Sequence, residues 1–179
     1  MRKTKNESKS IDSFASQLMN PSGHRPHRLA PRLRRASVVD LGLPHRPPFV
    51  FVGELIACEP GISAECLTTF ESDDPMFAGH FPGNPLVPGV ILTEALAQTA
   101  GIAAAAAYAE DARPRFLLSA IRGMKFFHAV RPQERIVLRA EKLAEVDDLL
   151  QFKAEALVKG KQVAAGQIVL SVAPDAAPD

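Results

Sequence analysis

The sequence has few cysteines and lacks the residue clusters that hold metals. Only Cys58 and Cys66 occur in 179 residues, which is too few for a disulfide scaffold. They do not have the spacing of metal ligands, and the histidines are not clustered. These absences predict no disulfide framework, no metal site and a location in the reducing cytoplasm.

The sequence also lacks the apolar segment of a secretory signal near its start. Residues 90–109 are long enough to span a bilayer. However, nine of these twenty residues are alanine, and the run contains Glu94. Because a charged residue in a membrane helix is costly, we interpret the run as a helix buried in a soluble protein. No membrane span is expected.

Positive charge is concentrated at the N-terminal end. Residues 1–46 contain ten Lys or Arg and three acidic residues, whereas the remainder contains eleven and seventeen. Residues 1–42 show no sustained period, so we expect a basic, disordered extension. An organelle transit peptide and a misassigned start codon are alternatives. The basic run at Arg32, Arg34 and Arg35 is interpreted as solvated, with no nucleic acid as partner.

Residues 43–173 are predicted to form one domain, followed by a flexible tail at 174–179. Alternating apolar residues and intervening turns predict strands at 49–58, 62–70, 115–127, 134–146, 149–158 and 162–172. Asp147-Asp148 and Gly160 are the expected hairpin turns. One apolar helix lies between the second and third strands, and its alanines and Gly101 should let a curved sheet approach closely. An α+β fold with an antiparallel sheet curled around the helix is expected.

Residues 80–98 place a histidine and a glutamate on either side of a helix start. His80 precedes a loop rich in Pro and Gly, and Glu94 lies on an otherwise apolar or small segment. A buried carboxyl group is costly without a function or a partner. Neutral imidazole is a competent base near neutral pH, and burial favours a carboxylic acid that can donate a proton. The two residues are a candidate acid/base pair.

Short blocks of sequence carry a family resemblance. They are His80-Phe81-Pro82-Gly83, Pro85, Pro88-Gly89-Val90, Glu94-Ala95 and Ala97-Gln98, with Leu43-Pro44-His45-Arg46 and Pro48-Phe49 upstream. At this spacing they resemble the hotdog-fold (3R)-3-hydroxyacyl-[acyl-carrier-protein] dehydratases of the FabZ type, over residues 43–172. The isomerising sister type carries an aspartate in place of Glu94, which favours the plain dehydratase.

The resemblance implies a hotdog fold, in which the curved antiparallel sheet wraps around a long central apolar helix. It implies a lyase without a cofactor, which dehydrates 3-hydroxyacyl thioesters on acyl carrier protein to trans-2-enoyl thioesters in fatty-acid or related acyl-chain biosynthesis. His80 would be the base for the C2 proton, and Glu94 the acid for the C3 hydroxyl group. The two would meet across a homodimer interface. The sequence neither supports nor excludes further assembly into a trimer of dimers.

The helix entry is expected to bind the thioester. First-turn N–H groups lack an intrahelical partner and lie at the positive end of the helix dipole. Those of Gly89 and Val90 could therefore stabilise charge on the thioester oxygen, and glycine would allow the thioester to approach closely. Gln98, one turn beyond Glu94, could hold the carboxyl group, and Phe81 completes the expected substrate-binding set.

The chain also departs from the family pattern. Phe127-His128 stands where typical members carry a basic pair, which leaves Lys125 and Arg131 as candidate contacts to the acidic carrier and its phosphopantetheine. Gly53 stands in place of an aspartate. Acyl chain length and pathway are not encoded in these patterns.

Two other functions remain open at this point. A hotdog acyl thioesterase is disfavoured because such enzymes lack the HFPG loop with a downstream Glu-Ala pair. A non-catalytic subunit of a heteromeric dehydratase is disfavoured because both His80 and Glu94 are present. The remaining histidines receive no mechanistic role, and His45 is interpreted as structural; they are His24, His27, His45 and His128.

Overall fold

The computed structural model describes residues 42–174. The predictions of a disordered extension and a flexible tail lie outside this range, apart from its end residues Gly42 and Pro174, and they stay predictions. No helix within the described range is long and apolar enough to cross a membrane.

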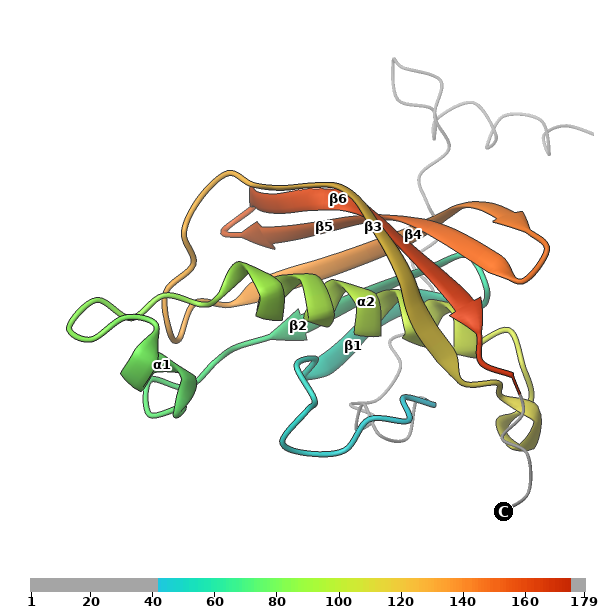
Figure 1. Cartoon of the computed structure of the whole chain (residues 1–179), viewed down its shortest axis with the longest axis horizontal. Helices are drawn as coiled ribbons and strands as arrows, with labels where there is room; N and C mark the ends of the chain where they lie inside the picture. Colours follow the sequence, from blue (N-terminus) through green and yellow to red (C-terminus); the bar gives the residue numbers. More distant parts are fainter. Residues whose placement is uncertain (1–41, 175–179) are drawn as a thin grey trace, which may run out of the picture. The chain divides into compact units, whose positions relative to one another are not determined.

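Within residues 42–174, six strands form one antiparallel sheet (Figure 1). They are β1 (Glu54–Glu59), β2 (Ser63–Thr68), β3 (Phe116–Phe126), β4 (Ile136–Val146), β5 (Leu149–Val158) and β6 (Lys161–Val172). Their order across the sheet is β1-β2-β4-β5-β6-β3, so β1 and β3 form its two edges. All six predicted strands are confirmed, but β1 begins five residues later than expected, at Glu54 rather than residue 49. The preceding residues form an irregular segment that reaches the site described below.

The two hairpins turn where the sequence predicted. Asp147 has a φ of 52° between β4 and β5, and Lys159 and Gly160 have φ of 50° and 77° between β5 and β6. Two consecutive residues with positive φ give the backbone twist that matches tightly joined antiparallel strands. The glycine at position 160 adopts this conformation without steric cost.

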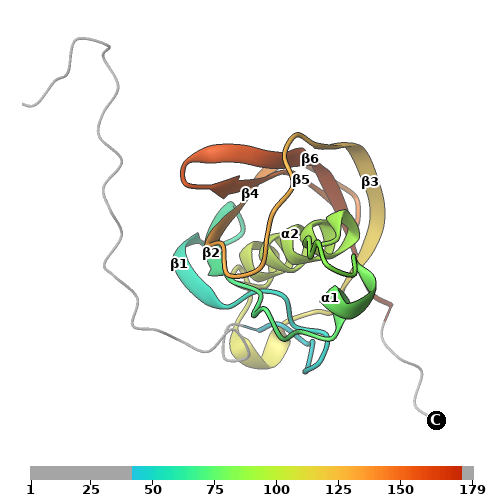
Figure 2. The same cartoon turned by 90° about the vertical axis from the view of Figure 1, so that its left-hand side faces the viewer.

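The long helix α2 (Gly89–Ala105) packs against the concave face of the sheet, which curls around it in Figure 2. Leu96 and Ile102 of the helix share one core with Leu138, Phe152 and Ile168 of the sheet, and each is at most 1% exposed. The sheet covers one side of the helix, and connecting segments cover much of the rest. This burial explains why the helix has no polar stripe. The predicted buried helix is therefore confirmed.

The helix ends four residues earlier than its alanine-rich sequence suggested. Ala107 and Tyr108 donate backbone hydrogen bonds to Ala104 and Ala105, which tightens the last turn and ends the helix. A short 3-10 turn, η2 (Glu110–Ala112), follows before β3. Residues 107–112 are exposed, and alanine propensity alone does not extend a helix that has no packing partner.

The prediction that Gly101 allows close approach of the sheet is wrong. A Cβ atom at this position would have no neighbour within 4 Å. Ala95 and Ala100 are fully buried and fill the tight positions instead, whereas Gly101 lines a cavity. The missing side chain of Gly101 thus leaves room in a pocket and does not bring the sheet closer to the helix.

Candidate active site

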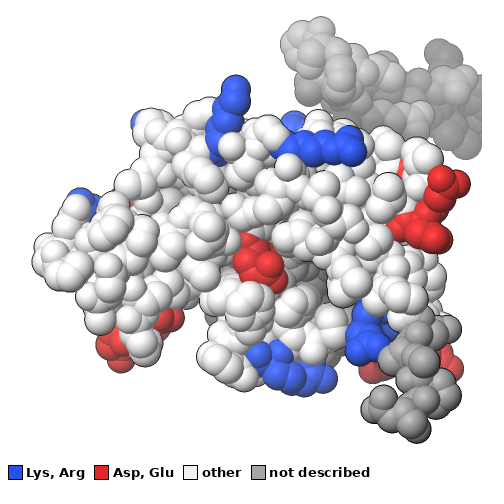
Figure 3. Space-filling model, viewed as in Figure 1, with Lys and Arg blue, Asp and Glu red and all other residues white. Residues whose placement is uncertain are grey.

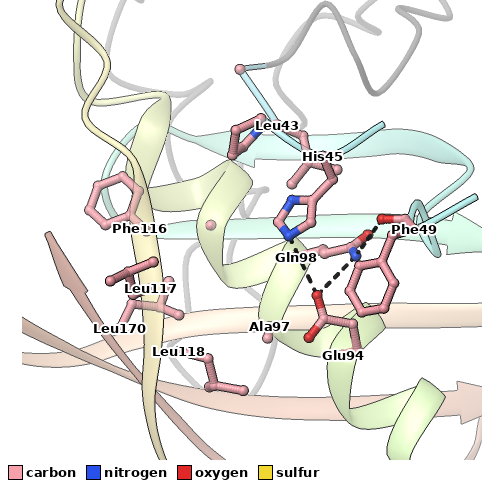
Figure 4. A pocket seen from close by; sticks show the side chains of 13 residues that line it. Leu43, His45, Phe49, Glu94, Ala97, Gln98, Phe116, Leu117, Leu118 and Leu170 are labelled. Atoms are coloured by element: carbon pink, nitrogen blue, oxygen red, sulfur yellow. Dashed lines mark hydrogen bonds and ion pairs between the residues drawn. The ribbon is translucent and has the colours of Figure 1, made fainter. Parts of the chain in front are cut away.

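A cavity of about 230 Å³ opens beside α2 (Figure 4). Its apolar wall includes Leu43 from the segment before β1, Phe116 and Leu118 from β3, and Leu170 from β6. Among the described residues in this wall, only Glu94 carries a carboxyl group. Figure 3 shows an acidic side chain recessed in a hollow on this face, with uncharged surface around it. The cavity can therefore hold an apolar chain next to one acidic group.

Glu94 lies on the second turn of α2, inside the helix that the sequence predicted, and its side chain is 21% exposed. Its Oε1 atom accepts a hydrogen bond from Nε2 of Gln98 at 3.0 Å. The two residues are four positions apart on one helix, which is the spacing that brings side chains together. The structure thus brings together Glu94 and Gln98, as the sequence analysis expected.

The orientation of the Gln98 amide is set by the segment before β1. Its Oε1 atom accepts a hydrogen bond from the backbone N–H of Phe51 at 2.9 Å, and its Nε2 also donates to the Phe49 carbonyl at 3.3 Å. Since Gln98 is only 1% exposed, its polar atoms must find these partners inside the protein. The amide nitrogen therefore has to face Glu94, and Oε1 of Glu94 has to act as an acceptor.

His45 approaches Glu94 from the same segment. Its Nε2 atom lies 3.6 Å from Oε1 of Glu94, and its ring stacks on Phe49 with 6.1 Å between ring centroids. The sequence analysis gave this histidine no mechanistic role. Its place in the upstream family block was the available signal, but 49 positions separate it from Glu94, and no helix or strand period links the two.

His80 follows the one-turn helix α1 (Met76–Gly79), which the sequence analysis did not predict. The Nδ1 atom of His80 lies 3.0 Å from the Leu86 carbonyl, and the ring stacks on Phe81 with 4.1 Å between centroids. A carbonyl oxygen can only accept, so Nδ1 carries the proton and Nε2 is left with its lone pair. The loop thus presents the nitrogen that a base requires.

The structure does not bring His80 to the Glu94 cavity within one chain. The residues that line the cavity come from positions 42–49, α2, β3 and β6, and His80 is not among them. Phe81 is 49% exposed and also lies outside this wall. Eight residues separate His80 from the start of α2, as the sequence indicated.

Gly89 is the first residue of α2, after the N-cap residue Pro88. Among the described residues, no hydrogen-bond partner is recorded for the backbone N–H groups of Gly89 and Val90. A Cβ atom at position 89 would lie 3.0 Å from the ring of Phe126. A larger residue at this position would have to push the ring aside, a contact that sequence reasoning missed because Phe126 lies on β3.

Neither cysteine has the properties of a nucleophile. Burial raises the pKa of the Cys66 thiol to about 12, and burial followed by the charge of Glu59 raises the pKa of Cys58. Since the thiolate is the reactive form, both remain thiols near neutral pH. Neither thiol is therefore a candidate nucleophile near neutral pH.

Comparison with protein families identifies the chain. A model of the ApeI-like family, described as ApeI dehydratase, matches residues 58–167. A 3-hydroxyacyl-[acyl-carrier-protein] dehydratase FabZ from Ruminiclostridium cellulolyticum is 40% identical over 127 residues, which cover 70% of this chain and 88% of the relative. The FabZ of Anaeromyxobacter sp. is 36% identical over 135 residues, covering 73% and 85%. The chain belongs to the family of FabZ and ApeI-like dehydratases.

Solved structures confirm the fold expected for a FabZ and ApeI-like dehydratase. The dehydratase heterocomplex ApeI:P from Xenorhabdus doucetiae matches with a TM-score of 0.67 and 18% identity, covering 79% of this chain and 94% of that chain. A hypothetical thioesterase with coenzyme A from Streptococcus pneumoniae matches with a TM-score of 0.54 and 9% identity, covering 67% and 84%. At these identities the likeness shows the hotdog fold alone.

Proposed function

We propose that the protein dehydrates (3R)-3-hydroxyacyl thioesters carried by acyl carrier protein to trans-2-enoyl thioesters. The observation that carries this proposal is a carboxyl group held by a buried amide in an apolar cavity. The family relatives are named for this reaction. A dehydratase of this type is a lyase and serves the synthesis of fatty acids or related acyl chains.

His80 is the base in this proposal. Its Nδ1–H donates to the Leu86 carbonyl, which fixes the tautomer and leaves Nε2 free to take the C2 proton. The electron pair of the broken C2–H bond then forms the C2–C3 double bond as the C3–O bond breaks. Since imidazole can accept a proton near neutral pH, His80 needs no metal or organic cofactor for this step.

Glu94 is the acid. Its proton moves to the departing C3 oxygen, so that the leaving group is water and Glu94 becomes a carboxylate. The proton gained by His80 and the proton lost by Glu94 balance, and exchange with water resets both groups. The proposal requires Glu94 to carry its proton when the substrate binds in the apolar cavity.

The start of α2 stabilises the charge that develops on the thioester oxygen. The unpartnered N–H groups of Gly89 and Val90 lie at the positive end of the helix dipole. Donors that are fixed before the reaction stabilise an oxyanion more than they stabilise the neutral carbonyl group. Phe81 contacts the His80 ring and forms part of the substrate-binding surface in this proposal.

The active enzyme in this proposal is a homodimer in which His80 of one chain faces Glu94 of the other. Its support is that His80 lies outside the Glu94 cavity, and that β3 is an edge of the sheet formed by the described residues and carries large apolar side chains. Leu117, Ile121 and Phe126 are 52%, 49% and 51% exposed. Such an edge favours association with a second copy.

The carrier docks beside the helix entry in this proposal. Lys125 is exposed on β3, and Nη1 of Arg131 donates to the side chain of Asn84 in the loop after His80 at 3.1 Å. Phe127, which replaces a basic residue of the family pattern, is 46% exposed. We also propose a cytoplasmic location, because both cysteines are free thiols and a reducing compartment keeps thiols in this form.

The purified chain should be incubated with 3-hydroxyacyl thioesters of several lengths, on acyl carrier protein and on a short thiol. Enoyl absorbance without release of thiol is the expected result. Release of thiol without enoyl product would instead establish a thioesterase. If neither product forms with any carrier, and a second hotdog chain restores activity, the protein is a non-catalytic subunit.

A further inference from the structure

The segment before β1 holds His45 against Glu94. Nη1 of Arg46 donates to the carbonyl oxygens of Leu43, Pro44 and His45, at 3.1, 3.2 and 2.9 Å. These bonds close the segment into a tight bend on the rim of the cavity. Stacking on Phe49 then aims the ring of His45 at the carboxyl group of Glu94, as Figure 4 shows.

The surroundings of His45 select its tautomer. Its Nδ1 atom is buried and has no hydrogen-bond partner among the described residues. A buried N–H without an acceptor is costly, so the proton of the neutral ring belongs on Nε2. This nitrogen lies 3.6 Å from Oε1 of Glu94, which is too long for a direct hydrogen bond but close enough for its N–H dipole to act on that oxygen.

The two oxygens of Glu94 therefore have different surroundings. Oε1 accepts the hydrogen bond from Gln98 and faces the N–H of His45. A carboxyl oxygen that faces two donors is disfavoured as the site of the acid proton, since an O–H in that place would meet N–H groups. The acid proton is consequently directed to Oε2, the oxygen turned away from both donors.

We propose that His45 is a positioning residue that, with Gln98, fixes Glu94 with its proton on Oε2. The proposal rests on the acid role of Glu94 in the proposed function. His45 acts on the carboxyl group and does not itself exchange protons with the substrate. Loss of His45 should therefore lower the rate of the chemical step, whereas substrate affinity should stay close to normal.

Two substitutions separate positioning from packing and from proton transfer. His45→Phe keeps the stacking on Phe49 and removes both nitrogens. We expect kcat to fall severalfold and by at most roughly tenfold, because a nearby N–H dipole contributes no more than a hydrogen bond, with KM within about twofold. His45→Gln can place an amide N–H near the position of Nε2, although it cannot be protonated. It should recover most of kcat and leave the pH profile of the wild type unchanged.

Other outcomes would overturn the proposal. Unchanged kcat in His45→Phe would make His45 a packing residue. Equal loss in both variants, with a changed pH profile, would make it a proton carrier. Urea unfolding of each variant identifies losses that come from stability alone.

A second measurement is independent of activity, so it tests the tautomer even if the wild type fails to dehydrate any 3-hydroxyacyl thioester. Long-range proton–nitrogen NMR spectra of the wild type identify which nitrogen of neutral His45 carries hydrogen, and His45→Phe assigns the signal. Hydrogen on Nε2 is expected. Hydrogen on Nδ1 would overturn the proposal, whereas failure of dehydration with hydrogen on Nε2 would count against the acid role of Glu94.

Discussion

The surroundings of Glu94 and of His80 are built in different ways. Glu94 is fixed by side chains and backbone groups from distant parts of the chain, since Gln98 links it to Phe49 and Phe51. His80 is fixed within one short loop, where it bonds to the Leu86 carbonyl. The position of the proposed acid therefore depends on the folded core, whereas that of the proposed base depends on local loop geometry.

The largest effect should come from replacing the acid itself. Glu94→Gln keeps an oxygen that can accept from Gln98 but removes the donated proton, so turnover should fall about a thousandfold. The rate of enoyl formation measures this loss, with circular dichroism as a check that the fold is intact. Near-normal turnover would remove Glu94 from the mechanism.

A mixture of two inactive variants tests whether acid and base come from different chains. His80→Asn and Glu94→Gln should each be inactive as homodimers. After unfolding and refolding together, about half of the dimers should be mixed, each with one intact site, so roughly a quarter of wild-type activity should return. If acid and base instead act within one chain, no mixing ratio restores turnover.

The distributed surroundings of the acid are tested through Gln98. Gln98→Leu leaves the partly buried N–H of Phe51 without its acceptor, so the free energy of unfolding should fall by roughly 1–3 kcal/mol. Turnover should also fall, since Glu94 loses its donor. Urea unfolding measures the first effect. Gln151→Leu is the matched control. Nε2 of Gln151 donates a hydrogen bond of 2.8 Å to Oε1 of Gln167, and neither residue lines the cavity. Gln151→Leu should lower the free energy of unfolding by less than Gln98→Leu does.

The local surroundings of the base are tested through Gly83, whose φ is 74°. A Cβ atom there has no neighbour within 4 Å, so a substitution costs only backbone strain. Gly83→Val should destabilise the loop by about 1–2 kcal/mol and lower kcat a few-fold. Gly83→Asn, which tolerates positive φ, should have a smaller effect on both. Equal behaviour of the two variants would mean that loop strain does not reach His80.

These two kinds of surroundings also explain what the sequence could predict. The strands and the buried helix follow from periods that are local in the chain. The roles of His80 and Glu94, which stay predictions, rest on short local blocks of sequence. The contact between Glu94 and Gln98 follows from helical spacing. His45 and Phe126 were missed because they reach the site from other elements of the fold, and the cavity-facing position of Gly101 depends on where the sheet ends over the helix.

The uncovered edge at β3 also affects how the protein can be handled. An eleven-residue strand with its backbone groups and apolar side chains open to water can pair with any extended chain it meets. If the proposed homodimer forms through this edge, a newly made or highly diluted subunit can either pair with a second copy or aggregate. Yield and specific activity should both depend on protein concentration, and very dilute stocks should lose activity before they unfold.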